Sequence, residues 1–232
     1  MLNILVTGAN RGVGLELVRQ CIKRGDRLFA GCRRPEEAGE LRHLLADNPG
    51  RLSILKLDVT SEPTLVQARA VVEAEAGRLD VLFNNAAVNF GDETLLAVKA
   101  QELMDSMQVN AVGPVLVVKH FLGLLKLGRS PKVINISSEA GSISRMRQFR
   151  GYGYYGSKAA LNMYTRSLSK DPDMEGILVV ALHPGWVRTD MGGPSASLPV
   201  EESVRGIMRV FERLTFADQG KFLTYTSEEY PW

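Results

Sequence analysis

Residues Thr7–Gly14, Thr-Gly-Ala-Asn-Arg-Gly-Val-Gly, stand between a short apolar run and a longer run with helical periodicity. The preceding residues read Met-Leu-Asn-Ile-Leu-Val, and this β-branched, apolar composition predicts a buried strand over Asn3–Val6. From Val13 to Arg24 apolar side chains recur at the spacing of a helix. Because a strand, a glycine turn and a helix form the first half of a βαβ unit, this stretch predicts an α/β fold.

The three glycines of this turn indicate a site for a phosphate group. Gly8 would allow the tight turn after the strand, Gly12 would let backbone amides approach a pyrophosphate, and Gly14 would let the helix pack on the sheet. Unpaired N–H groups and the helix dipole favour an anion at this helix N-terminus. The spacing Gly-x-x-x-Gly-x-Gly differs from the common Gly-x-Gly-x-x-Gly fingerprint, and a plain βα turn is the alternative interpretation.

Strand and helix patterns alternate along the whole chain. Further strands are predicted at Arg27–Gly31, Leu52–Leu57, Leu79–Phe83, Lys132–Ile136, Leu178–Leu182 and Lys221–Thr224. Further helices are predicted at Glu37–Ala46, Glu62–Ala76, Ala97–Lys126, Gly156–Ser169 and Val200–Leu214. This alternation predicts a doubly wound Rossmann fold, in which helices cover both faces of a parallel seven-stranded sheet.

The 232 residues, 45% of them hydrophobic, suffice for one α/β core, and no linker or repeat divides them, so we expect a single domain over residues 1–232. A net charge of +2, mixed along the chain, gives no argument for nucleic acid or an anionic membrane. We expect no membrane span, because no apolar run approaches the required length.

The cysteines and histidines indicate the compartment and the absence of a metal site. Cys21 and Cys32 fall in a predicted helix and a predicted strand, as buried thiols of a reducing compartment do. The first strand begins at Leu2 and leaves no room for a signal peptide, so we expect a cytoplasmic protein. The three histidines, His43, His120 and His183, lack the spacing of metal ligands, and we expect no metal.

The end of the second strand indicates the cofactor. NAD-binding βαβ units place Asp or Glu there, to bond the ribose 2′-hydroxyl. This chain has Cys32 followed by Arg33 and Arg34, and guanidinium groups bind a 2′-phosphate that a carboxylate would repel. Arg11, inside the glycine turn, could reach the same phosphate. These residues favour NADP(H) over NAD(H); the alternative is that Arg33 and Arg34 only solvate a loop.

Tyr154 and Lys158 form a candidate proton-transfer pair. They are four residues apart and would lie one turn from each other on a helix face. A nearby ammonium favours the phenolate, which would let Tyr154 exchange a proton with a carbonyl or an alcohol near neutral pH. An isolated pair of this kind is more often a solvated helix face, so its weight depends on the rest of the chain.

Polar or turn-forming residues follow four of the other predicted strands. These segments are Asp58–Thr60, Asn84–Ala87, Ser137–Ser138 and His183–Thr189. Ligands of parallel sheets gather beyond the carboxyl ends of the strands, so we expect these segments to meet at one binding edge.

Over essentially its whole length the chain resembles the short-chain dehydrogenase/reductase family. The motifs that carry the resemblance are Thr7-Gly8-x3-Gly12-x-Gly14, Asp58, Asn84-Asn85-Ala86, Asn110, Ser138, Tyr154-x3-Lys158 and Pro184-Gly185. More narrowly, His183–Gly193 and the final Pro231-Trp232 resemble the C-factor and sniffer-type carbonyl reductase branch.

The resemblance implies a catalytic tetrad of Asn110, Ser138, Tyr154 and Lys158. Ser138 would bind the substrate oxygen and Tyr154 would transfer the proton. Lys158 would hold the nicotinamide ribose and lower the Tyr154 pKa, and Asn110 would bend its helix and hold a water that relays protons. The implied cofactor contacts are Gly8, Asn10, Arg11, Gly12, Val13, Gly14, Arg33, Asp58, Val59, Asn84, Ala86, Tyr154, Lys158, Pro184, Gly185, Val187 and Thr189.

The chain departs from the family pattern at two places. Ala87 stands where the family usually has glycine, which is tolerable if the backbone there does not need a positive φ. Ser138 lies sixteen residues before Tyr154, a longer separation than usual, and Ser142 is a rival for its role. We expect the extra residues, around 145–150, to bulge beside the site. Tyr152 and Tyr155 are rival phenols, but neither is four residues before Lys158.

The expected activity is reduction of small aldehydes or ketones with NADPH, running reversibly. The short segment Asp190–Pro199, expected as the substrate lid, suggests an open pocket and does not fix the substrate. The alternative is a cofactor-binding signalling or regulatory protein like C-factor. A nucleotide-sugar epimerase is disfavoured, because the chain lacks room for a sugar domain. Family relatives commonly pair through the helices that here hold Asn110 and Tyr154, so we expect a homodimer or homotetramer.

Overall fold

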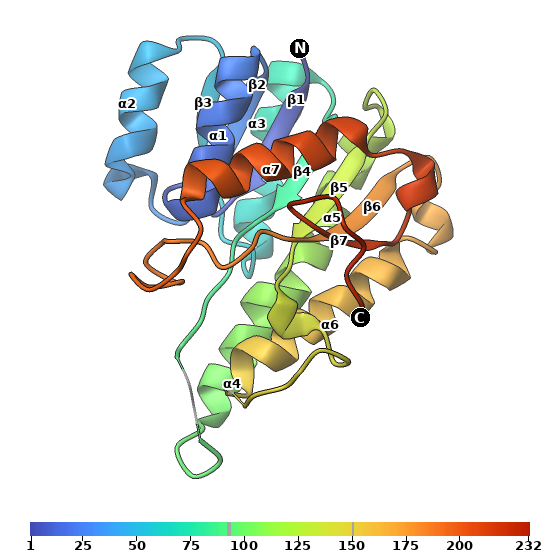
Figure 1. The fold of residues 1–232 in the computed structure, drawn as a ribbon. Helices are drawn as coiled ribbons and strands as arrows, with labels where there is room; N and C mark the ends of the chain where they lie inside the picture. Colours follow the sequence, from blue (N-terminus) through green and yellow to red (C-terminus); the bar gives the residue numbers. More distant parts are fainter. Residues whose placement is uncertain (92–93, 150) are drawn as a thin grey trace.

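The computed structural model describes residues 1–91, 94–149 and 151–232, and its strands form a seven-stranded sheet. The strands are β1 (Asn3–Thr7), β2 (Arg27–Cys32), β3 (Leu52–Lys56), β4 (Val81–Asn84), β5 (Lys132–Ile136), β6 (Leu178–His183) and β7 (Phe222–Thr224). They pair in parallel in the order β3-β2-β1-β4-β5-β6-β7 (Figure 1). The predicted parallel sheet is confirmed.

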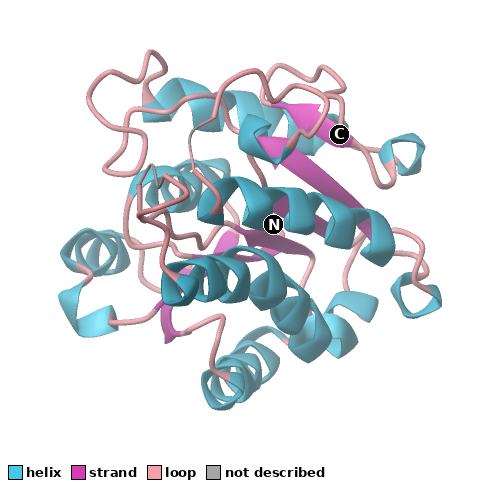
Figure 2. Ribbon diagram, turned by 90° about the horizontal axis from the view of Figure 1, so that it is seen from below, coloured by secondary structure: helices cyan, strands magenta, loops and turns pink. Residues whose placement is uncertain are grey.

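Helices cover both faces of this sheet, as the alternating pattern predicts (Figure 2). The α-helices are α1 (Gly12–Arg24), α2 (Gly39–Asp47), α3 (Glu62–Ala76), α4 (Ala100–Met107), α5 (Gly113–Lys126), α6 (Gly153–Leu168) and α7 (Val200–Arg213). Short 3₁₀ helices are η1 (Pro35–Glu37), η3 (Glu139–Gly141), η4 (Pro172–Met174) and η5 (Phe216–Asp218). The core cluster on one face takes buried residues from α1, α2 and α7, and the cluster on the other takes them from α3, α5 and α6.

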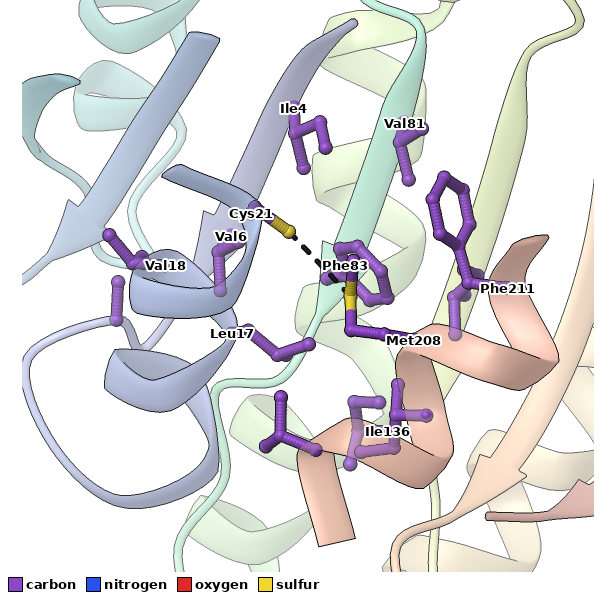
Figure 3. Packing of buried hydrophobic residues seen from close by; sticks show 14 of the residues in the cluster. Ile4, Val6, Leu17, Val18, Cys21, Val81, Phe83, Ile136, Met208 and Phe211 are labelled. Carbon is purple, nitrogen blue, oxygen red and sulfur yellow. Dashed lines mark hydrogen bonds between the residues drawn. The ribbon is translucent and has the colours of Figure 1, made fainter. Parts of the chain in front are cut away.

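The packing of α1 against α7 shows how the first of these clusters is filled. The Cys21 thiol lies 3.7 Å from the Met208 sulfur, and the rings of Phe83 and Phe211 meet edge to face at 5.8 Å between centroids (Figure 3). Burial raises the pKa of Cys21 to about 12, so this thiol stays protonated. Cys21 and Cys32 are both free and buried, as predicted.

The strand order places the candidate site. The chain runs outward from β1 through β2 to β3, then returns to the other side of β1 with β4. At this reversal the helices that follow β1 and β4 leave on opposite faces of the sheet, which opens a crevice at the carboxyl ends of the strands. The glycine turn after β1 and the Asn84–Ala87 segment after β4 therefore meet at one edge.

The predicted helix Ala97–Lys126 is divided. Residues Gln108–Val112 form a π-helix, η2, between α4 and α5. This interruption confirms the expected local distortion around Asn110. By length and composition the stretch Ala100–Lys126 is apolar enough to cross a membrane, contrary to the expectation that no run approaches this length. Half of an 18-residue apolar window in this stretch is buried inside the protein, and core helices of soluble proteins have the same length and composition, so the stretch is weak evidence for a membrane span.

Two further helix boundaries differ from the prediction. The helix predicted over Glu37–Ala46 begins later, because Pro35–Glu37 form the separate 3₁₀ helix η1 and α2 begins at Gly39. Ala38 separates the two, since its ψ of 66° lies outside the helical range. Helix α6 begins at Gly153 instead of Gly156, which brings Tyr154 into its first turn. Tyr154 and Lys158 therefore lie one turn apart on the same helix, as their spacing predicts.

Candidate active site

A groove of about 1120 Å³ runs along the carboxyl ends of the strands. This volume slightly exceeds the range of roughly 300–1,000 Å³ that is usual for ligand pockets. The predicted site residues that line it are Gly8, Asn10, Arg11, Gly12, Val13, Arg33, Asp58, Val59, Ala86, Ser138, Tyr154, Lys158, Pro184, Gly185, Val187 and Thr189. Three predicted site residues, Gly14, Asn84 and Asn110, do not line it. Most of the predicted site residues thus line one groove, and these three lie outside its lining.

The glycine turn is fastened to the end of β4 by two polar side chains. Thr7 Oγ1 accepts hydrogen bonds from the backbone N–H groups of Asn85, at 3.0 Å, and Ala86, at 3.1 Å. The Asn85 side-chain amide donates to the carbonyls of Thr7 and Gly8. Gly8 has a φ of 64°, and a Cβ there would lie 2.8 Å from Ala86 Cα, so only glycine fits this approach. Asn85 is therefore a structural clamp of the turn.

Gly14 lies behind the turn and not in the groove. A Cβ at this position would meet the Gly8 carbonyl oxygen at 2.3 Å and the Asn85 amide nitrogen at 2.5 Å. The first turn of α1 directs this residue onto Asn85 and the Gly8 carbonyl, and its predicted contact with the cofactor stays a prediction. The close packing of the helix that the prediction also gave to Gly14 is what the structure shows.

We expect Gly14→Ala to lower the free energy of unfolding by about 2 kcal/mol, because the added methyl overpacks a backbone contact. Gly123→Ala is the matched control, since Gly123 lies within α5 and a Cβ there would point into open space. That substitution should raise the free energy of unfolding by up to about 1 kcal/mol. Urea denaturation of both variants measures the difference; equal effects would contradict the packing role of Gly14.

Three arginines that line the groove, Arg11, Arg33 and Arg34, differ in their partners. Arg34 pairs with Glu37 at 2.8 Å, and Arg11 reaches across the groove to Asp190 at 3.2 Å. Arg33 is exposed, lines the groove and makes no ion pair with any residue that the structure describes. Among these three arginines, Arg33 is therefore the one without an ionic partner in the described part of the chain.

Asn84 is buried within the protein and not exposed to the groove. Its side-chain amide donates to Asn135 Oδ1 at 2.9 Å, and Asn135 donates to Thr165 Oγ1, also at 2.9 Å. These three residues tie β4, β5 and α6 together. Asn85 and Ala86 line the groove and Asn84 does not, and the predicted contact of Asn84 with the cofactor stays a prediction.

Asn110 likewise acts inside the protein. Its side chain accepts from the Val88 N–H and donates to the Val88 carbonyl, both at 2.8 Å, and donates to Ser157 Oγ at 2.9 Å. Ser157 Oγ in turn donates to the Tyr154 carbonyl at 2.8 Å. With these bonds Asn110 holds Val88, which lines the groove, against the first turn of α6. The implied role of holding a relay water stays a prediction.

Ser138, Tyr154 and Lys158 meet in the groove. Ser138 Oγ accepts from the Ala140 N–H at 3.1 Å, and the Ser138 hydroxyl is hydrogen-bonded with the Tyr154 phenol. The rival Ser142 is buried and does not line the groove, which favours Ser138. Among the rival phenols, Tyr155 also lines the groove and Tyr152 does not.

The ionisation of this cluster differs from the prediction. Burial raises the pKa of Tyr154, against a lowering by the Ser138 hydrogen bond. Burial also lowers the pKa of Lys158 to about 7, and its amine donates to the Ile136 carbonyl at 2.8 Å. Desolvation disfavours both the phenolate and the ammonium, so the Tyr154 pKa is raised, contrary to the expected lowering by Lys158. Tyr154 instead keeps its proton, as a proton donor must.

The buried lysine makes a testable contribution to stability. Its folded pKa of about 7 lies below the ordinary 10.5, so between these values the unfolded chain binds more protons and stability rises with pH. Below pH 7 the full cost of burying the charge applies. We expect Lys158→Met to raise the free energy of unfolding by about 3–5 kcal/mol at pH 6 and by little near pH 10.

Chemical denaturation at several pH values would measure this gain. Lys170→Met is the control, because Lys170 is exposed, and it should leave the pH dependence unchanged. A gain for Lys158→Met that did not shrink as the pH rose would contradict the desolvation account.

The segments beyond the glycine turn are arranged largely as predicted. Residues 143–149 are exposed beside the site, as expected for a bulge; Arg150, part of the same prediction, lies outside the described residues. The φ of Ala87 is not positive, which explains why alanine is tolerated there. In the described ranges no group of three His, Cys, Asp or Glu could hold a metal ion.

Several groove residues were not predicted as contacts. They include Thr60, Val88, Asn89, Trp186 and Met191. Trp186 is 47% exposed, and its indole N–H donates to the Gly192 carbonyl at 2.9 Å. Position beside a strand end was the available signal for Thr60 and Val88. The positions of Asn89, Trp186 and Met191 in the groove depend on the conformation of their loops, which the sequence pattern does not predict.

Comparison with known proteins agrees with this geometry. A family model described as short chain dehydrogenase matches residues 2–197. The C-signal protein of Myxococcus xanthus is 42% identical over 156 residues, which are 67% of this chain and 94% of that protein. The carbonyl reductase Sniffer of D. melanogaster superposes with a TM-score of 0.95 at 38% identity, covering 100% of both chains. An NADPH-bound carbonyl reductase from chicken fatty liver gives a TM-score of 0.93 at 34% identity, covering 100% of this chain and 99% of that one.

Proposed function

The chain belongs to the short-chain dehydrogenase family, and on that premise we propose that it reduces small aldehydes and ketones with NADPH. One observation carries the proposal. A single groove has a glycine turn and Arg33 at one end, and Ser138, Tyr154 and Lys158 at the other. A phosphate-binding end and a proton-donating end in one groove are what hydride transfer from a dinucleotide to a carbonyl requires.

The groove fits a dinucleotide phosphate by its shape and charge. The close approach at Gly8 leaves no room for a side chain, so backbone amides border the groove at the N-terminus of α1. Arg33 would hold a 2′-phosphate, and no carboxylate follows β2 directly to repel it. The NADPH bound to the chicken enzyme supports the same choice. When bound, the nicotinamide supplies the hydride.

The proton side of the reaction follows from the three polar residues. The Ser138 hydroxyl would donate a hydrogen bond to the substrate oxygen and hold it beside Tyr154. Tyr154, which burial keeps protonated, would give its proton to that oxygen as negative charge develops. Lys158, with a pKa of about 7, would bond a ribose hydroxyl and return a proton to Tyr154.

The open part of the groove suggests the substrate class. Trp186 and Met191 line the groove with 47% and 41% of their surfaces exposed, and Val88 lines it from the segment after β4. These side chains present apolar surface to a bound molecule. We therefore propose apolar or aromatic aldehydes and ketones as the substrates.

The test is NADPH oxidation, followed at saturating cofactor, with a panel of aldehydes, ketones and quinones, and the same panel with NADH. We expect turnover with apolar carbonyls and a preference for NADPH. Tight NADPH binding without turnover of any panel member would contradict the reductase proposal. It would favour the second candidate, a cofactor-binding signalling protein, which the 42% identity to the C-signal protein supports.

A further inference from the structure

His183 occupies a position in the groove that the proposed reaction does not yet use. It ends β6 and its side chain is 9% exposed. Its imidazole Nδ1 accepts a hydrogen bond from the backbone N–H of Glu139, at 3.1 Å. Because Glu139 directly follows Ser138, this bond reaches the backbone beside the proposed substrate-binding hydroxyl.

The short helix η3 explains why this bond matters. The first N–H groups of any helix lack partners within the helix, and here two side chains supply them. Ser138 Oγ accepts from the Ala140 N–H, and His183 accepts from the Glu139 N–H. Since a lone pair of the Ser138 oxygen is engaged by Ala140, the hydroxyl proton is directed elsewhere, and Tyr154 is its neighbour in the groove.

Residues close to the C-terminus pack against His183 (the C-terminus lies near β7 and α6 in Figure 1). The Tyr230 ring lies 5.8 Å from the His183 ring and packs edge to face on Phe222 at 5.3 Å. The Tyr230 N–H donates to the Phe222 carbonyl at 2.7 Å, and the Tyr225 N–H donates to the His183 carbonyl at 2.9 Å. The histidine is thus fixed through both its ring and its backbone.

The His183 imidazole is also in the neutral form that it needs to accept the hydrogen bond from the Glu139 N–H. Burial lowers the pKa of His183 to about 4, so the imidazole is neutral at ordinary pH. An Nδ1 that accepts from an amide leaves the single ring proton on Nε2. The Glu139 bond therefore assigns the tautomer.

We propose that His183, supported by Tyr230, is a positioning residue that orients Ser138 toward the carbonyl substrate by fixing the Glu139 amide. The inference rests on the reductase function proposed above, and it predicts an effect on turnover and not on cofactor binding. Removal of the acceptor frees the η3 turn, so that the Ser138 hydroxyl loses its fixed direction.

Two variants of His183 test the proposal. His183→Leu removes the acceptor and should lower kcat by about 10²-fold, the usual loss for a small misplacement, with the Kd for NADPH unchanged. In His183→Asn the amide oxygen can accept from Glu139, so kcat should stay within about threefold of the wild type. His43→Leu, the same change on the exposed surface of α2, is the control. Wild-type turnover in His183→Leu, or an equal loss in His183→Asn, would overturn the proposal.

Amide exchange separates this inference from the reductase function itself. Residue-resolved hydrogen exchange should show the Glu139 amide at least about tenfold faster in His183→Leu than in the wild type and in His183→Asn. A wild type that turns over no carbonyl would overturn the reductase function, and the exchange rates would still decide the positioning role. Equal Glu139 exchange in all three proteins would overturn the positioning role, whatever the activity.

Discussion

Tyr154→Phe is expected to lower turnover of carbonyl substrates by about 10³-fold or more, at the upper part of the range for losing a general acid. The substitution removes only the hydroxyl, which is hydrogen-bonded with Ser138, and keeps the ring in the first turn of α6. Because the ring and the glycine turn remain, the Kd for NADPH should change by less than about twofold. Steady-state rates and a fluorescence titration with NADPH measure the two quantities.

The control for this variant lies on the same helix. Tyr164→Phe makes the identical change ten residues along α6, at a residue that does not line the groove, and should keep wild-type turnover. Full activity of Tyr154→Phe would refute the assignment of the proton donor. Loss of NADPH binding together with turnover would instead assign Tyr154 a role in holding the cofactor.

Arg33→Asp should weaken NADPH binding by about 100-fold and leave NADH binding nearly unchanged. Hydrogen bonds to charged groups contribute about 1.5–3 kcal/mol, and the new carboxylate would also repel the 2′-phosphate. Arg33 is the best placed of the three arginines, since Arg34 pairs with Glu37 and Arg11 pairs with Asp190. The ratio of the two dissociation constants is the readout.

Arg42→Asp makes the same charge change on the exposed surface of α2, outside the groove, and should leave the NADPH to NADH ratio as in the wild type. A comparable loss in this control would indicate long-range electrostatics in place of a contact. An unchanged ratio in Arg33→Asp would remove the argument that Arg33 selects the cofactor.

Much of the fold could be predicted because its signals are local. Apolar strands alternate with helical periodicity, and the parallel sheet follows from that pattern. The four-residue spacing of Tyr154 and Lys158 placed both on one helix, since helical geometry depends only on neighbouring residues. The helix ends were less exact, because Pro35 and Gly153 act on turns whose limits depend on packing.

The partners of the polar residues at the site depend on a different cause, contacts between distant parts of the chain. Asn84 and Asn85 are adjacent and chemically identical, yet one joins a buried ladder with Asn135 and the other clamps the glycine turn. Arg11, a candidate for the phosphate, pairs with Asp190, which is 179 residues away in sequence. The residues adjacent in sequence do not predict either of these partners.

The amino-acid sequence by itself determined which segments become strands and helices, where glycine must stand, and which polar residues reach the binding edge. Only the tertiary structure decided which of those residues enter the groove and in what charge state. Periodicity and spacing act through covalent neighbours, whereas desolvation and ion pairing act through space. Burial of Tyr154 and Lys158 in one groove raises the pKa of the phenol and lowers that of the amine, and that burial exists only once the chain has folded.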